Sequence, residues 1–168
     1  MFESLSAFAE WLSGTAVSTL IQNVSWIIPS VQSIHLLAIA VVMSSVVVIF
    51  LRVIGVVMRE RSLLEVTHRF MPWVWYALVV LLITGTILIV GEPTRSLTNW
   101  MFQLKMLLLL IVVACSVILQ WPLRTNATFW DGTTLTRASG KVIALISLAL
   151  WMGIVFAGRW IAYAGDAI

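Results

Sequence analysis

Charged residues are scarce in this sequence, and their scarcity limits the kind of protein it encodes. Only 10% of the 168 residues are Asp, Glu, Lys or Arg, whereas soluble domains carry about 25%. A chain that is 61% hydrophobic, with a mean hydropathy of +1.06, has too few polar side chains to cover a water-facing surface. A soluble globular domain is therefore excluded, and lipid is the expected solvent.

Several residue types that carry chemistry are also nearly missing. The single cysteine, Cys115, excludes a disulfide within one chain. Glu3 and Glu10 stand where a signal peptide would be basic, so no signal peptide is expected. The chain has no P-loop, no Rossmann glycine pattern and no nucleophile–base pair. Only two histidines remain as candidate ligands, His35 and His68.

Long apolar segments account for most of the chain. The expected transmembrane spans are residues 29–57, 63–90, 100–121 and 140–164. Each reaches the ~20 residues that cross a bilayer, and short connections make consecutive helices antiparallel neighbours. The expected fold is therefore all-α, an integral membrane four-helix up-down bundle formed by residues 26–168. Residues 1–25 have apolar side chains at helical spacing and predict an interfacial amphipathic helix.

Local signals suggest where the spans begin and end. Ser62 and Glu65 form an S-x-x-E capping box that predicts the start of the second helix. Pro72 is expected to kink that helix or to reset its start. Pro122 is expected to end the third span, and the polar stretch Leu123–Thr136 to form the longest loop.

The cations are distributed unequally between the two ends of this bundle. We call the end that holds both chain termini the termini end and the opposite one the loop end. The expected loop-end cations are Arg52, Arg59, Arg61, Arg69, Arg124, Arg137 and Lys141, and the termini-end cations are Arg95, Lys105 and Arg159. Cytoplasmic loops carry the excess of Lys and Arg. The expected location is thus a bacterial inner membrane, with both termini periplasmic.

Three nitrogen-bearing side chains are expected at similar depth on the termini side. At ~1.5 Å of rise per residue, His35 lies roughly 13 Å beyond Trp26 and Lys105 roughly 8 Å beyond Trp100. Arg159 lies roughly 9 Å before Gly165. A cation within a membrane bundle costs about 2.5–3.5 kcal/mol on insertion scales and usually marks a site.

A bound haem b uses all three side chains. His35 would be the axial ligand, and Lys105 and Arg159 would pair with the propionates. A quinone-like or porphyrin substrate would use the same cations. Alternatively, His35 donates to a carbonyl or serine of a neighbouring helix, and both cations snorkel to the membrane surface. A copper site would recruit the nearby methionines, which are Met43, Met101 and Met106.

His68 is expected near the loop end, on the far side of the bilayer core from His35. It therefore should not bind the same iron within one subunit, and contact with lipid headgroups is its simpler role. Ligation by two histidines would need a second subunit or another topology.

The sequence resembles a known family through four motifs, Trp26–Pro29 leading into Ile34–Leu37, Arg69–Trp73, Phe102–Met106 and Ala157–Trp160. These resemble small bacterial four-helix membrane proteins that form a domain of unknown function, and the resemblance spans nearly the whole chain. It implies a fold and a membrane location without an established activity.

A more distant similarity is to CopD-type copper-resistance domains and HemJ-type protoporphyrinogen oxidases. It is carried by the His-Leu-Leu motif at His35 and the hydrophobic run after Lys105. In HemJ-type enzymes the matching residues are linked to haem binding and activity, so the similarity implies these roles for His35 and Lys105. The second histidine of that pattern is replaced here by the stretch Cys115–Gln120.

Two further functions stay open at this point. A CopD-like transporter of a metal or small solute would use the trio for permeation or delivery. A non-catalytic accessory subunit would pack against a larger complex, or a homo-oligomer would form, through the small residues Gly153 and Ala157, whose spacing allows close helix contact.

Overall fold

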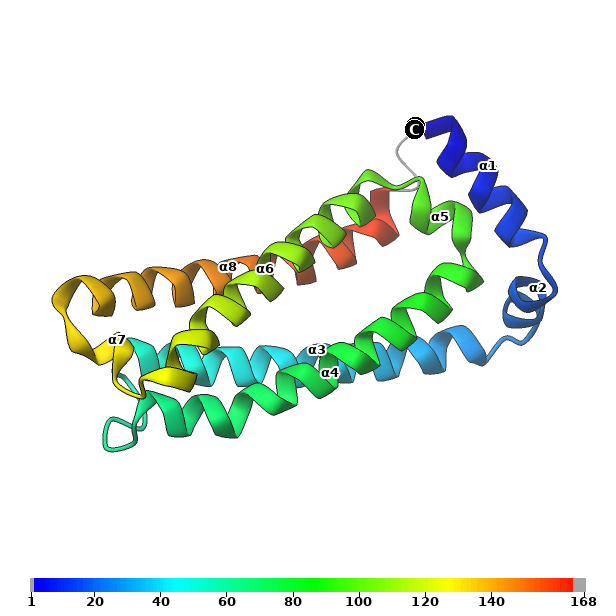
Figure 1. The fold of residues 1–168 in the computed structure, drawn as a ribbon. Coiled ribbons are helices and arrows are strands. Elements are labelled where there is room, and N and C mark those ends of the chain that lie inside the picture. The colour runs from blue at the N-terminus through cyan, green and yellow to red at the C-terminus, as the bar shows by residue number, and fades with distance from the viewer. Residues whose placement is uncertain (1, 165–168) are drawn as a thin grey trace.

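The computed structural model describes residues 2–164, which Figure 1 shows as helices joined by short turns. Their bounds are α1 Phe2–Ser13, α2 Ala16–Asn23, α3 Ile27–Val53, α4 Leu63–Gly91, α5 Pro93–Leu97, α6 Trp100–Thr125, α7 Phe129–Gly132 and α8 Thr134–Ala164. No strand occurs within this range, so the all-α fold class is confirmed. Residue 1 and residues 165–168 of the expected domains lie outside the described residues.

Helices α3, α4, α6 and α8 are long and apolar enough to cross a membrane. The four predicted spans are thereby confirmed, and the chain is a multi-pass membrane protein. The first span is shorter than predicted, because α3 ends at Val53. Beyond it, Gly55 adopts φ +80°, a left-handed conformation that suits glycine, and turns the chain toward α4.

The start of α4 follows the predicted signal. Ser62 caps the helix, and its Oγ accepts a hydrogen bond from the backbone N–H of Glu65 at 3.2 Å. Pro72 lies inside α4, so it does not reset the helix start at Leu63.

The prediction that Pro122 ends the third span is wrong, because α6 continues through it to Thr125. A proline removes its own N–H donor and therefore one helical hydrogen bond, to the carbonyl oxygen four residues before it. The three residues after Pro122 nevertheless stay helical. The N–H of Asn126 still donates to the carbonyl oxygen of Pro122 at 2.9 Å and closes the helix.

The polar loop predicted from Leu123 to Thr136 is also shorter than expected. It contains α7, and α8 begins at Thr134 rather than at the predicted residue 140. The N–H of Thr136 donates to Thr133 Oγ1 at 3.2 Å, and the N–H of Thr133 donates to Thr136 Oγ1 at 3.0 Å. This reciprocal cap satisfies N–H groups at the start of α8 and lets a polar segment be helical.

The four long helices form two antiparallel pairs. Helix α3 packs along α4, α6 packs along α8, and the pairs meet mainly where α3 contacts α8. Across the described part of the chain, α4 and α6 pack little against one another. Figure 1 shows the pairs close together near α7, at the loop end, and diverging toward α5, at the termini end. The prediction that consecutive spans are neighbours is therefore correct for α3 with α4 and for α6 with α8, but wrong for α4 and α6, and the bundle is less closed on that side.

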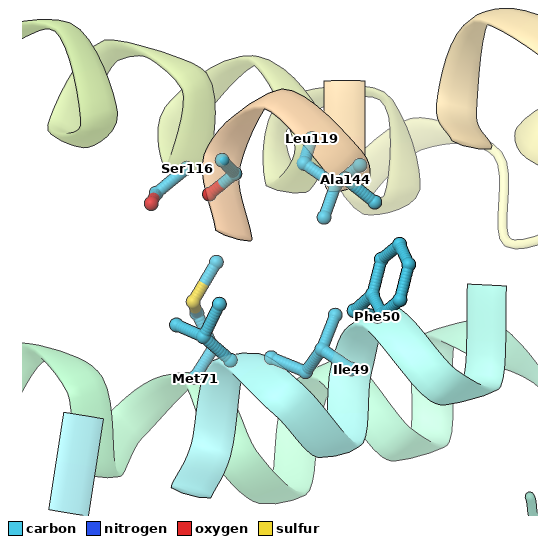
Figure 2. Close-up of a pocket in the computed structure, with 8 residues that line it drawn as sticks. Ile49, Phe50, Met71, Ser116, Leu119 and Ala144 are labelled. Carbon is cyan, nitrogen blue, oxygen red and sulfur yellow. The ribbon is translucent and has the colours of Figure 1, made fainter. Parts of the chain in front are cut away.

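The core is apolar and lies between the pairs. Figure 2 shows side chains of α6 and α8 facing those of α3 and α4 across a small cavity. The cavity is about 20 Å³, which is room for one water molecule. Its lining residues are Val46, Ile49, Phe50, Met71, Ser116, Leu119, Ala144 and Ser147. A cofactor-sized molecule would therefore have to lie elsewhere.

The predicted interfacial helix is two helices, α1 and α2, separated at Gly14 and Thr15. Helix α1 packs on α5, and α2 packs on the end of α4. Ser18 Oγ donates to the carbonyl oxygen of Val90 at 2.7 Å, and a Cβ on Gly91 would lie only 2.9 Å from Ile21 Cγ2. Several apolar side chains of this segment are at least half exposed, namely Phe8, Trp11, Val17 and Leu20. They suit a position in the membrane interface.

Candidate functional site

His35 lies on α3 about two turns inside the termini end. It follows the helix start at Ile27 by eight residues, or roughly 12 Å along the axis. The side chain is half-buried, and its Nδ1 lies 2.7 Å from Oγ1 of Thr84 on α4. Thr84 is 6% exposed, so this hydrogen bond joins α3 and α4 inside the bundle.

The Thr84 hydroxyl decides which nitrogen of His35 carries the proton. Thr84 Oγ1 donates its single hydrogen to the carbonyl oxygen of Val80, 2.7 Å away, so it accepts from Nδ1 of His35. A neutral imidazole has one N–H, which leaves the lone pair of Nε2 available. Ligating histidines are oriented in this way, with the second ring nitrogen donating to a fixed acceptor.

The same hydrogen bond also fits a purely structural role for His35, in which its ring donates to a group on a neighbouring helix. The acceptor is a threonine hydroxyl rather than a carbonyl or a serine. Because the bond engages Nδ1 and leaves Nε2 without a hydrogen-bond partner among residues 2–164, a structural bond and a ligand role are compatible in one side chain.

Lys105 is the second charged group of the site. It lies on α6, five residues after Trp100, and its side chain is half-buried. Within residues 2–164 its ammonium group has no hydrogen-bond or ion-pair partner. A cation in the apolar part of a membrane bundle is costly unless it meets a counter-charge or water, and the pairing of Lys105 with an anionic group stays a prediction.

Two glycines make room for these nitrogens. A Cβ built on Gly85 of α4 would lie 3.7 Å from Cε1 of His35. A Cβ built on Gly158 of α8 would lie 3.6 Å from Nζ of Lys105. A methyl group fits at either distance, but a larger side chain would displace the imidazole or the ammonium.

The four spanning helices bring these groups to similar depth. Measured from the helix end on the termini side, His35 lies roughly 12 Å deep, Thr84 and Gly158 roughly 10 and 9 Å, and Lys105 roughly 8 Å. The similar depth predicted for His35 and Lys105 agrees with these positions, and their joint role in one site stays a prediction.

Arg159 and Glu92 lie nearer the surface. Arg159 follows Gly158, but its side chain is exposed and has no hydrogen-bond or ion-pair partner within residues 2–164. Glu92 pairs with Arg95 at 2.9 Å, and both side chains are more than 40% exposed. The carboxylate is thus engaged with Arg95 rather than with Lys105, and the role of Arg159 stays a prediction.

His68 is exposed on α4, one turn after the helix start at Leu63 and close to the loop end. His35 lies near the other end of the bundle, as expected. Among the described residues, no group of three or more His, Cys, Asp or Glu side chains can hold a metal ion.

The small residues of α8 are used inside the chain. A Cβ on Gly153 would lie 3.6 Å from Cδ1 of Leu108 on α6, and Ala157 is only 5% exposed. The close contact predicted from their spacing is made with α6, so this face is not free for a larger partner.

Thr84, Gly85 and Gly158 were missed at the level of sequence. The Thr84-Gly85-Thr86 triplet interrupts an otherwise apolar segment, and a polar residue within a membrane helix tends to face the bundle interior. That signal would have identified Thr84, but it does not say which helix the hydroxyl meets.

Comparison with known proteins identifies one family of unknown function. The family model DUF6644, described as a family of unknown function, matches residues 8–164. No curated protein and no solved structure matches this chain.

Proposed function

The chain belongs to the DUF6644 family, whose function is unknown, and we propose that it is a membrane protein that binds haem b at the termini end of its bundle. The observation that carries the proposal is the hydrogen bond from His35 Nδ1 to Thr84 Oγ1. It supports a neutral imidazole whose Nε2 is available as an axial ligand.

The residues present fit the chemistry of haem b. The macrocycle is planar and apolar, and the long helices that carry His35 and Lys105 are apolar as well. Its propionates are anionic, and Lys105 is a half-buried cation without a counter-charge among the described residues. Lys105 would pair with one propionate, and the exposed Arg159 would take the second at the membrane surface.

A bound haem supplies one-electron redox chemistry. The residues of this chain would set its environment: Thr84 fixes the His35 ring, Gly85 and Gly158 leave space beside the nitrogens, and Lys105 neutralises negative charge.

The proposal includes a location. At the loop end, Arg59, Arg61, Arg69, Arg124 and Lys141 are all exposed, and an excess of cations is typical of the cytoplasmic side. We therefore infer a bacterial inner membrane in which the haem site lies in the periplasmic leaflet.

Absorption spectroscopy tests the function directly. The detergent-purified protein should show a Soret band in the oxidised state, sharpened α and β bands after dithionite, and near-stoichiometric haem in a pyridine haemochrome assay. A protein that stays colourless, even after reconstitution with haem, would overturn the proposal.

Two histidine variants identify the ligand. His35→Ala should abolish the haem spectrum while the helical circular dichroism is retained. His68→Ala is the matched control, because it removes the other histidine of the described chain from an exposed position, and its spectrum should be that of the wild type. An unchanged spectrum in His35→Ala would remove His35 as the ligand.

A further inference from the structure

A second hollow lies between α4 and α6, in the half of the molecule near the loop end and away from His35. It is about 150 Å³, larger than the core cavity, and its lining residues are Trp75, Val117, Gln120, Trp121 and Arg124. It exists because α4 and α6 pack little against each other, so the surfaces of the two helices leave a groove open to the membrane. We call these five residues the α4–α6 groove.

The groove has unused hydrogen-bond donors. Gln120 and Arg124 lie four residues apart on α6 and therefore project from the same helical face. Neither side chain has a hydrogen-bond or ion-pair partner among residues 2–164. A guanidinium and an amide that converge on one hollow offer several N–H groups to an oxygen-rich anion.

The groove also lies at the level of the membrane surface. Arg124 is in the last turn of α6, and Trp121 beside it is 66% exposed, as is common for tryptophan at the boundary between headgroups and acyl chains. Val117 and the half-buried Trp75 lie deeper along the two helices. The groove is thus polar at its outer end and apolar at its inner end.

We propose that the α4–α6 groove binds one anionic phospholipid, with the phosphate on Arg124 and Gln120 and an acyl chain along Val117 and Trp75. Arginine matches phosphate oxygens with two parallel N–H groups, and basic pockets between transmembrane helices bind anionic headgroups. The charge favours this occupant over a neutral quinone ring, which would leave the guanidinium without a counter-ion.

Native mass spectrometry of the full chain in detergent tests the proposal. After addition of equal amounts of phosphatidylglycerol and phosphatidylcholine, the wild type should retain one phosphatidylglycerol. Arg124→Gln should lower the retained fraction about five- to tenfold, because each cation near an anionic lipid is worth ~1 kcal/mol or more. Lys141→Gln is the matched control, since Lys141 is an exposed loop-end cation on α8 and should retain lipid as the wild type does.

Several outcomes would overturn it. Equal retention of the two lipids, or equal lipid loss in Arg124→Gln and Lys141→Gln, would mean that the loop end attracts lipid without a defined site. Displacement of the lipid by excess inorganic phosphate would make this a free-phosphate site, and co-purification of a quinone that Arg124→Gln removes would replace the lipid as occupant.

Tryptophan fluorescence gives a second readout that does not depend on lipid retention in the gas phase. In vesicles, brominated phosphatidylglycerol should quench the protein more than brominated phosphatidylcholine. The double variant Trp75→Phe/Trp121→Phe, which replaces both tryptophans of the groove, should remove that difference. Trp11→Phe should keep it, because Trp11 is as exposed as Trp121, at 66%, but lies on α1 at the termini end. A preference that survives this double variant would contradict binding in the groove.

Discussion

The two ends of the bundle use cations in different ways. At the loop end, Arg59, Arg61 and Arg69 are exposed, and the Arg52 Nε donates to the carbonyl oxygen of Arg61 at 2.8 Å in the connecting turn. At the termini end, Lys105 is half-buried inside the helix pairs and lies beside Gly158. The loop end thus has more positive charge, but the cation that lies within the apolar bundle, Lys105, is at the termini end.

This difference shows that burial marks a candidate binding site better than charge number does. Exposed cations at a membrane surface are solvated, cost little and mainly orient the protein. A cation within the bundle costs about 2.5–3.5 kcal/mol on insertion scales. Lys105 therefore calls for a ligand or a functional reason, whereas Arg59 and Arg61 do not.

Among variants that keep His35, the largest effect on haem affinity is expected from losing its hydrogen bond to Thr84. Thr84→Val removes the acceptor of the His35 N–H and should weaken haem retention about 10–100-fold, since outer partners of ligating histidines typically contribute that much. Thr86→Val is the control, because Thr86 is exposed on the same helix and donates only to Leu82 at 2.8 Å. Haem titration monitored at the Soret band measures both variants. Equal affinities would show that Thr84 does not position the ring.

A smaller effect on haem retention is expected from replacing the half-buried Lys105. Lys105→Met should lower haem retention about tenfold, because hydrogen bonds to charged groups contribute ~1.5–3 kcal/mol and ~1.4 kcal/mol is a factor of ten. The shape of the spectrum should not change, since His35 remains the ligand. Lys141→Met, at the loop end, should retain haem as the wild type does. If His68→Ala weakened retention more than Lys105→Met, the assignment of the site to the termini end would be wrong.

Substitutions at the loop end should change the stability of the protein more than they change its haem binding. A Cβ on Gly140 would lie 2.9 Å from Cε3 of Trp130, whose Nε1 donates to the carbonyl oxygen of Leu119 at 3.0 Å. Gly140→Ala should therefore destabilise the protein by ~1–3 kcal/mol, the usual cost of overpacking. Gly153→Ala, with 3.6 Å to Leu108, should be neutral or slightly stabilising. Thermal unfolding in detergent measures the difference, and equal midpoints would contradict the tight contact.

The smallest effect is expected at the exposed ion pair of the termini end. Glu92→Gln breaks the 2.9 Å contact with Arg95, whose side chain is 47% exposed, and such pairs contribute ~0–1 kcal/mol. The unfolding midpoint and the haem retention should both stay near the wild-type values. A marked loss of haem would instead place Glu92 within the site.

Much of the architecture was predictable because the signals are local or compositional. The four spans follow from runs of apolar residues, and Ser62 begins α4 as its capping pattern predicts. Pro122 was misleading because a proline removes only one helical hydrogen bond, and the bond from the N–H of Asn126 to the carbonyl oxygen of Pro122 still completes the last turn of α6. The early start of α8 was missed because it depends on reciprocal hydrogen bonds between Thr133 and Thr136.

The candidate site was predictable only in part. His35 and Lys105 stand out because a polar group in an apolar run is rare, and helix rise predicts their depth. Their partners do not stand out, because Thr84 and Gly158 are ordinary small residues of membrane helices.

By itself, the sequence determined that the chain spans a membrane, how many helices cross it and at what depth each polar side chain lies. These properties depend on hydrophobicity and on backbone hydrogen bonds within each helix, both of which are local. The tertiary structure alone decided that the two helix pairs meet where α3 contacts α8 and that Thr84 accepts the hydrogen bond from His35 Nδ1. It also decided that α4 and α6 leave a groove at Arg124. Such contacts depend on how the surfaces of distant helices fit together, and no single segment contains that information.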